Sequence, residues 1–372
     1  MAFARSAPRT SPLAPRLVAP LLAWFAAHAR DLPWRRTLDP YAIWISEIML
    51  QQTQVKTVIP YWERWLRALP DVQALAAAPE DRVLKLWEGL GYYTRARNLQ
   101  RAARVVVAEH GGRFPTDFAA LLALPGIGRY TAGAIASIAF NQPAPILDGN
   151  VIRVLTRLFA LTGDPKEKQL NTRLWRLAQE LVSAASAISN FKFQISNSSG
   201  PCSALNQALM ELGATVCTPR APTCLVCPLA AQCAAGRSGR AEEFPQMKAR
   251  AAATERRFVV AVLERGGKFL VRQRPAGAVN AGLREFPNEE LTDRQAAARA
   301  AAQWLGLPAA AFTSLQSVKH TITRYRITLD VLRAAAGRKR LMVETGATWA
   351  DFAALERLAF TSAHRRIARQ LG

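Results

Sequence analysis

Four closely spaced cysteines restrict the fold of this chain more than any other sequence feature. They lie within seventeen residues, in the spacing Cys217-x6-Cys224-x2-Cys227-x5-Cys233. Four thiolates on one short loop can converge on a single metal centre. Zinc also accepts four thiolates, but its usual arrangement is two close pairs separated by a longer spacer. The fifth cysteine, Cys202, stands apart and is expected to be a small core or loop residue.

The composition indicates two folded domains and a polyanionic partner. The chain has 372 residues, half of them apolar, which is enough for two cores of about 100–200 residues each. Its 49 Lys and Arg against 27 Asp and Glu give a net charge of +22, which suits a nucleic acid. The alternative is that arginine serves only as a solubilising residue. The small number of cysteines favours a reducing compartment. The sequence has no run of about 20 apolar residues, so no membrane span is expected. We therefore expect a cytoplasmic, nucleoid-associated protein.

Changes in sequence pattern divide the chain into segments. Residues 1–14 are expected to be a disordered tail, and residues 15–235 an all-helical domain with apolar residues three or four apart. Within this domain, residues 187–200 are interpreted as a surface insertion without chemistry. Residues 236–254 are expected to be a linker. Residues 255–372 are expected to form an α+β domain, with a hairpin around Gly266 and Gly267 and a helix over residues 293–305.

A glycine-rich motif, LPGIGRYTAGAI at residues 124–135, lies between two predicted helices. Gly126 and Gly128 allow a tight turn that leaves N–H groups at a helix N-terminus, where a phosphate is stabilised. About twenty residues later, PAPILDGNV at residues 143–151 contains Asp148. By itself, Asp148 is interpreted most simply as a helix cap. Together with the cysteine spacing, the two motifs resemble the endonuclease III superfamily, which implies a helix-hairpin-helix fold, a [4Fe–4S] cluster on the four cysteines and a catalytic Asp148.

Other motifs are similar to those of the adenine DNA glycosylase family. They are LPWR at residues 32–35, WISEIMLQQTQ at 44–54, GLGYY at 89–93 and NQALMELG at 206–213, so the resemblance is close over residues 17–235. Strand-cleaving superfamily members carry a Schiff-base lysine where this chain has Tyr130. Because tyrosine cannot form an imine, we expect base removal without strand cleavage.

Two carboxyl groups suit the chemistry that this family implies. Adenine leaves poorly, so a protonated acid must donate to its ring as the glycosidic bond breaks. Glu47, among Trp44, Ile48 and Met49, is expected to have a pKa raised by desolvation. The second carboxylate must remain ionised to stabilise the sugar cation, and this role is assigned to Asp148.

The resemblance also implies the remaining site residues. Asn150 and Tyr130 would support the sugar and Asp148, whereas Trp34, Arg35 and Glu211 would form the adenine pocket. The implied DNA contacts are Leu50, Gln52, Thr53, Tyr92, Gly126, Gly128 and Arg129. For Leu50, Trp34 and Tyr92, ordinary core packing is the alternative. The expected partner is double-stranded DNA with adenine opposite 8-oxoguanine or guanine, bound by a monomer.

The second domain resembles a Nudix domain through RQRP at residues 272–275 and GLREFP at 282–287. Its predicted helix is nearly free of the carboxylates that hold magnesium, so no nucleotide hydrolysis by this domain is expected. The family reads 8-oxoguanine with a His-x-Phe-Ser-His loop, to which His320, Ile322 and Thr323 correspond here. Ile322 replaces the aromatic residue and Arg324 the second histidine. The alternative for this segment is an exposed turn before a strand.

Three hypotheses follow from these motifs. The first is a monofunctional enzyme acting on adenine opposite 8-oxoguanine. The second is a relative that excises another base or also cleaves the strand. The third is a catalytically silent DNA-binding protein. The presence of both Glu47 and Asp148 favours an enzyme.

Overall fold

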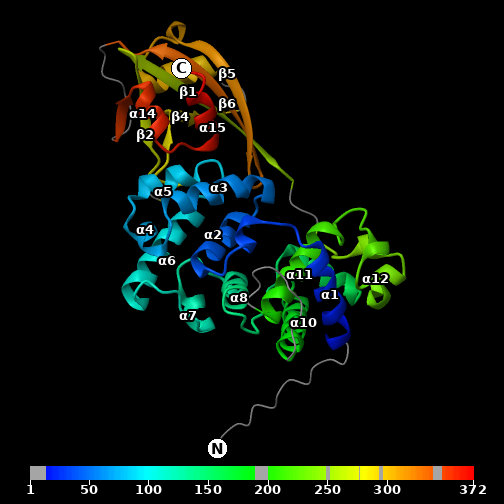
Figure 1. Ribbon diagram of the computed structural model, residues 1–372. Helices are drawn as coiled ribbons and strands as arrows, with labels where there is room; N and C mark the ends of the chain where they lie inside the picture. Colours follow the sequence, from blue (N-terminus) through cyan, green and yellow to red (C-terminus); the bar gives the residue numbers. More distant parts are fainter. Residues whose placement is uncertain (1–13, 189–199, 249–251, 276, 293–295, 338–345) are drawn as a thin grey trace, which may run out of the picture. The chain divides into compact units, whose positions relative to one another are not determined.

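The structure, a computed structural model, describes residues 14–188, 200–248, 252–275, 277–292, 296–337 and 346–372. These residues fall into two compact units (Figure 1). The first unit runs to Ala77 and continues over Arg101–Ala249, and the second combines Ala78–Gln100 with Arg250–Gly372. Residues 78–100, which the sequence assigns to the helical domain, also pack with the C-terminal part of the chain, through long-range contacts that sequence pattern does not reveal.

The segment that the sequence predicts as a linker, residues 236–254, contains ordered elements in its first part. Helix α12 (Ala234–Arg237) and the 3-10 turn η4 (Ala241–Glu243) occupy this segment, and Phe244 is buried. The amide of Lys248 still donates to the Asp164 carboxylate at 3.3 Å. Most of the predicted tail and insertion (residues 1–13 and 189–199) lies outside the described residues.

The first unit is helical throughout its described residues, as predicted. Its helices enclose an apolar core in which buried side chains from α1, α8, α9, α10 and α11 meet. The bounds are α1 Ala14–His28, η1 Pro33–Arg35, α2 Pro40–Leu50, α3 Val55–Ala68, α4 Val72–Ala77, α6 Thr94–His110, α7 Phe118–Ala123, α8 Arg129–Ile138, α9 Gly149–Leu158, α10 Lys168–Ser186, α11 Pro201–Thr215, η2 Cys224–Val226 and η3 Ala230–Gln232, with α6 beginning in the second unit. Cys202 lies in this core, as expected.

Close backbone approaches bring three helices together beside the predicted catalytic motif. A Cβ atom on Gly133 of α8 would lie 2.2 Å from the Pro145 carbonyl oxygen, and one on Gly213 of α11 would lie 2.6 Å from Asn150 Cβ. Neither position tolerates a side chain without backbone movement. These two glycines therefore let α8 and α11 approach the segment that leads into Asp148.

The second unit contains a mixed sheet with helices on both faces, consistent with the predicted Nudix-like domain. The strand order is β3-β2-β1-β6-β5, with β4 also paired to β1 and β7 to β2; the β1–β6 pair is parallel. Alternate residues of β1 enter two cores, one under α14 and α15 and the other under α13. The bounds are α5 Glu80–Trp87, β1 Thr254–Arg265, β2 Lys268–Gln273, β3 Arg284–Glu285, β4 Asn288–Glu290, α13 Ala297–Leu305, η5 Ala309–Ala311, β5 Thr313–Ile322, β6 Tyr325–Ala335, β7 Ala347–Ala350, α14 Phe352–Arg357 and α15 Ser362–Ala368.

The predicted hairpin is confirmed, because Arg265 pairs with Lys268 across the two glycines. In the described part of the chain, no helix has the length and apolar character needed to cross a bilayer.

Candidate active site

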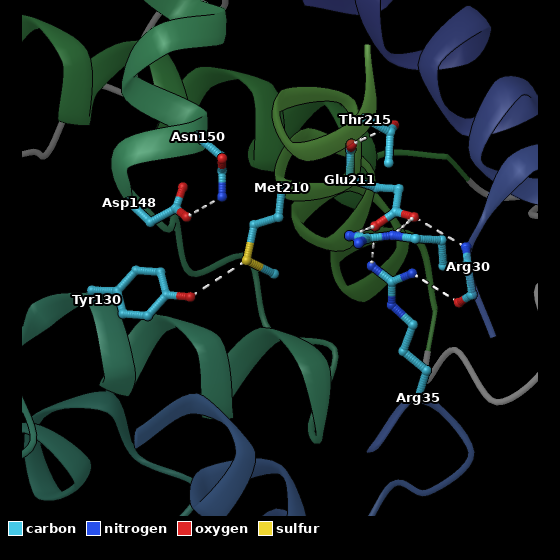
Figure 2. Close-up of polar contacts among 8 residues, drawn as sticks. All are labelled: Arg30, Arg35, Tyr130, Asp148, Asn150, Met210, Glu211 and Thr215. Carbon is cyan, nitrogen blue, oxygen red and sulfur yellow. Dashed lines mark hydrogen bonds and ion pairs between the residues drawn. The ribbon is translucent and has the colours of Figure 1, made fainter. Parts of the chain in front are cut away.

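One pocket in the first unit gathers most of the predicted catalytic residues. Its volume is about 520 Å³, and its walls come from η1, α2, α8, α11 and the start of α9. The lining includes Trp34, Arg35, Glu47, Leu50, Gln52, Thr53, Tyr130, Asp148, Asn150 and Glu211. Figure 2 shows several of these side chains directed toward one another from different helices.

Glu47 lies on α2, a helix in which every residue from Tyr41 to Met49 is buried. Its side chain is 5% exposed, and the Tyr130 hydroxyl donates to its carboxylate at 2.6 Å. Burial raises the pKa of Glu47 to about 7; the Tyr130 hydrogen bond opposes this rise and the charge of Asp148 adds to it. Near neutral pH, Glu47 is thus able to hold a proton and release it, as a general acid must.

Tyr130 is the second residue of α8 and supports Glu47 as a hydrogen-bond donor. Burial raises the pKa of Tyr130 well above its ordinary value, and the neighbouring carboxyl of Glu47 raises it further. The hydroxyl therefore keeps its proton. It also lies 3.4 Å from the Met210 sulfur (Figure 2).

Asp148 caps α9 and also faces the pocket. Its carboxylate accepts the Val151 N–H at 2.7 Å. It also accepts the Asn150 side-chain amide at 2.8 Å (Figure 2). Burial raises the pKa of Asp148, and these hydrogen bonds oppose the rise because they stabilise the charged form. The cap interpretation is thereby confirmed, and the same carboxylate lines the pocket, where it can have a second role.

The opposite wall of the pocket is an ion-pair cluster centred on Glu211. This fully buried carboxylate accepts from Arg30 Nε at 2.7 Å and from Arg35 Nη2 at 2.9 Å (Figure 2). Burial alone would raise the pKa of Glu211, but the two guanidinium groups lower it to about 2. Arg35 and Glu211 are predicted from the sequence, but Arg30 is not, because its only sequence signal is its position five residues before Arg35.

The end of α2 and the turn after it carry three of the predicted DNA contacts. Leu50, Gln52 and Thr53 line the pocket, and Gln52 is exposed with a left-handed backbone (φ 61°). Trp34 is buried, and its ring centroid lies 6.1 Å from that of Trp62. Because Trp34 also lines the pocket, it both packs in the core and forms part of the pocket wall. Tyr92 belongs to the second unit, so its position relative to this pocket is not described.

The glycine-rich hairpin has the predicted geometry but one unexpected contact. Gly126 adopts φ 76°, Gly128 is the N-cap of α8, and both are exposed. The Arg129 guanidinium, by contrast, lies 4.0 Å from the centroid of the Trp175 ring. A cation–π contact of this kind occupies the face of the guanidinium. Any phosphate contact of Arg129 must therefore use the edge of the group.

The four clustered cysteines are free, half-buried thiols on the loop after α11. N–H groups are directed at two sulfurs, with Arg157 Nη1 3.4 Å from Cys217 Sγ and the Gly236 amide 3.3 Å from Cys233 Sγ. Burial raises the pKa of Cys227 to about 11, and the other three thiols contribute to this rise. Among the described residues, no group of three or more His, Cys, Asp or Glu is positioned to hold a metal ion. The donor type and the N–H groups nevertheless fit a thiolate-bound cluster.

A chain of hydrogen bonds connects Asp148 to the cysteine loop. The Asn150 amide donates to Asp148, and Arg153 Nη2 donates to Asn150 Oδ1 at 2.8 Å. The same guanidinium donates to the carbonyl oxygens of Cys217, at 2.7 Å, and Gly213, at 2.6 Å. The cysteine loop thus helps to fix the orientation of the carboxylate that faces the pocket.

The predicted lesion-reading residues lie on a hairpin of the second unit. Ile322 and Tyr325 pair across the two-residue turn that joins β5 to β6. His320 is half-buried on β5, whereas Thr323 is exposed at the turn with φ 53°, and its hydroxyl donates to the Ile322 carbonyl. The Thr323 hydroxyl is therefore presented at a hairpin tip, which suits recognition but is also an ordinary turn feature.

Comparisons with known proteins agree with this architecture. Residues 45–180 match the model of the HhH-GPD superfamily base excision DNA repair proteins, and residues 258–370 match the NUDIX domain. The chain is thus a helix-hairpin-helix base excision repair protein with a Nudix-like domain. Adenine DNA glycosylases of Homo sapiens and Mus musculus are each 36% identical to it, covering 94% of this chain and 72% and 76% of theirs. The chain belongs to the adenine DNA glycosylase family, which confirms the prediction of an enzyme.

A solved structure supports the fold of the helical part. The structure of a thermostable thymine-DNA glycosylase is 30% identical, covers 60% of this chain and 97% of its own, and superposes with a TM-score of 0.52. Because that protein is described as acting on thymine, the shared fold does not specify the base that is removed.

Proposed function

We propose that this protein is a monofunctional DNA glycosylase that removes adenine mispaired with 8-oxoguanine or guanine in double-stranded DNA. The proposal rests chiefly on Glu47 and Asp148, two carboxyl groups in different environments that line one pocket. One is buried beside a tyrosine that donates to it, and the other accepts two hydrogen bonds. This difference suits one group to donate a proton and the other to remain charged.

The residues have distinct roles in the proposed reaction. The adenine nucleotide is extruded from the duplex into the pocket, between the Glu211 cluster and the carboxyl groups. Glu47 donates its proton to the adenine ring as the glycosidic bond breaks. Asp148 stabilises the positive charge that develops on the sugar, and water completes the hydrolysis. Leu50 and Gln52 occupy the gap left in the duplex, and the β5–β6 turn contacts the opposite base.

A single-turnover assay tests the proposed activity. Duplexes carrying one adenine opposite 8-oxoguanine or guanine are incubated with excess protein, with and without subsequent alkali treatment. We expect cleaved product only after alkali, because base removal alone leaves an intact strand. Cleavage without alkali would indicate a strand-cleaving relative, and no product at all would indicate a DNA-binding protein without activity. A duplex with thymine opposite guanine serves as the control for base identity.

The proposed reaction also predicts a pH dependence. Because burial raises the pKa of Glu47 to about 7, its proton is lost as the pH rises through this value, and excision should decline on the alkaline side. Asp148 must be ionised, and burial also raises its pKa, so excision should decline again at acidic pH. Single-turnover rates measured between about pH 5 and 9 should give a bell-shaped profile. A rate that stays constant from neutral to alkaline pH would contradict an acid role for Glu47.

We further propose that Cys217, Cys224, Cys227 and Cys233 bind a [4Fe–4S] cluster. The support is four free thiols on one loop, N–H groups directed at two sulfurs and membership of this family. The cluster would fix the conformation of the cysteine loop. Because Arg153 donates to the Cys217 carbonyl and to Asn150, the loop would in turn fix the N-terminus of α9.

Replacement of a cysteine tests the cluster. Wild-type protein should contain iron and absorb near ~400 nm, as iron–sulfur proteins do. Cys227→Ser should lose both signals, whereas Cys202→Ala, which removes a thiol outside the loop, should keep both. Zinc in the wild-type protein, or iron retained in full by Cys227→Ser, would refute the assignment.

A further inference from the structure

The loop between α5 and α6, residues 88–93, has an unusual backbone. Gly89 and Gly91 adopt φ 107° and 69°, and Tyr92 adopts φ 46°. A tyrosine in the left-handed region is strained and stays there only when neighbouring groups hold it. Tyr92 is 47% exposed, so burial of its ring contributes little to holding this conformation. The Trp87 indole restrains the segment by donating to the Gly91 carbonyl at 3.0 Å, and the residues on either side add a further restraint.

Both ends of the loop are bound to the backbone of one residue near the C-terminus, Phe360. The Phe360 N–H donates to Glu88 Oε1 at 2.8 Å, and the Tyr93 hydroxyl donates to the Phe360 carbonyl at 3.3 Å. Phe360 is fully buried in the core under α14 and α15. A buried residue of the C-terminal domain, defined as residues 250–372, thus contacts the residues that precede and follow the strained segment.

A buried ion pair strengthens the first of these attachments. Arg365 Nε of α15 donates to Glu88 Oε1 at 2.9 Å, and the two side chains are only 10% and 12% exposed. The same guanidinium donates to the Leu355 carbonyl at 2.9 Å, and Lys85 bridges Glu88 Oε2, at 2.9 Å, and the Leu358 carbonyl, at 3.2 Å. Truncating one partner of such a pair leaves a buried charge without compensation, which is strongly destabilising locally.

The loop also presents its aromatic ring next to a fixed cation. The Arg95 guanidinium donates to the carbonyls of Leu90 and Gly91 and lies 5.8 Å from the centroid of the Tyr92 ring. An exposed aromatic ring that is already positioned can stack on a nucleobase at little entropic cost. The arrangement therefore suits contact with stacked bases.

We propose that the C-terminal domain positions Tyr92 for insertion into the duplex, with Glu88 and Arg365 as positioning residues. The proposal rests on the proposed glycosylase function and extends the role of this domain. Besides contacting the opposite base, the domain fixes the conformation of a residue that supports extrusion of the target base.

A double-mutant cycle in the full-length protein tests this coupling. The probe is a duplex with 2-aminopurine at the target position, whose fluorescence reports extrusion, together with single-turnover release of adenine from the matching duplex. Tyr92→Ala should lower extrusion about tenfold to a hundredfold, as expected for loss of one stacked aromatic. Glu88→Ala should lower extrusion about tenfold. Extrusion by the double variant should equal that of Tyr92→Ala within about twofold, because the two residues act together. Glu88→Gln, which still accepts the Phe360 N–H, should recover part of the loss.

The control variant is Arg257→Gln, which breaks an exposed ion pair with Asp330 on the sheet of the same unit. It should leave extrusion unchanged, and melting curves on all variants detect general unfolding. Additive losses for Glu88→Ala and Tyr92→Ala, or no effect of Tyr92→Ala, would overturn the positioning role. If the wild-type protein releases no adenine, the proposed function fails instead, and the two failures are distinguishable.

Discussion

Glu47→Gln is expected to lower the single-turnover rate of adenine excision by about 10³-fold, within the range by which general acids accelerate reactions. Glutamine has nearly the same shape and still accepts the Tyr130 hydrogen bond, which is 2.6 Å long in the wild type. It has no proton to transfer to the departing base. Binding of the intact duplex should change little, because Glu47 is buried and contacts no phosphate. The measurement pairs single-turnover rates with equilibrium binding.

The same substitution lowers activity but is expected to raise stability at alkaline pH. In the unfolded chain the Glu47 carboxyl ionises near its ordinary pKa of 4.5, whereas burial in the folded chain raises its pKa to about 7. The folded state therefore loses stability as the pH rises from 4.5 to 7, by on the order of 3 kcal/mol. Glu47→Gln avoids this loss, so its melting temperature relative to wild type should be higher at pH 8 than at pH 5.

Glu180→Gln is the matched control for this variant. It changes another carboxylate of the same unit, one on α10 that is paired with Arg176. Its excision rate should equal that of wild type. If the excision rate of Glu47→Gln were within tenfold of the wild-type rate, Glu47 would not be the general acid.

Local motifs were sufficient to select residues that line one pocket, although their chemical roles stay predictions. Glu47 stands among apolar residues, which is sufficient to predict a raised pKa, and Asp148 directly precedes a helix that it caps. The hairpin and the cysteine loop are likewise local, because their geometry depends on glycines and on spacing within a few residues.

Features that depend on distant contacts were not predictable in the same way. Arg30 joins the pocket only because α1 packs beside α11, 181 residues later in the chain. Residues 78–100 resemble other short helices of the first unit, and their attachment to the C-terminal domain depends on Glu88 and Tyr93 meeting Phe360. The ordered start of the segment expected to be a linker is a similar case. Phe244 is buried and its carbonyl accepts from Arg157 at 3.0 Å, which the polar character of that segment conceals.

Asp148→Asn is expected to lower excision by about 10³-fold, because the variant lacks the charge that faces the sugar cation. Asparagine caps helices as well as aspartate does, so it can still accept the Val151 N–H and the stability should change by less than about 0.5 kcal/mol. Asp148→Ala should lower excision similarly but also lose the cap, at a cost of about 1 kcal/mol. The pair of variants thus separates the structural role of Asp148 from its chemical role.

Asp117 provides the control, since it caps α7 by accepting the Ala120 N–H at 2.8 Å and lies outside the pocket lining. Asp117→Ala should lose comparable stability and retain full excision. Single-turnover rates and melting temperatures of all three variants distinguish the two roles. If capping were the only function of Asp148, the asparagine variant would excise adenine at the wild-type rate, because it preserves the cap and removes only the charge.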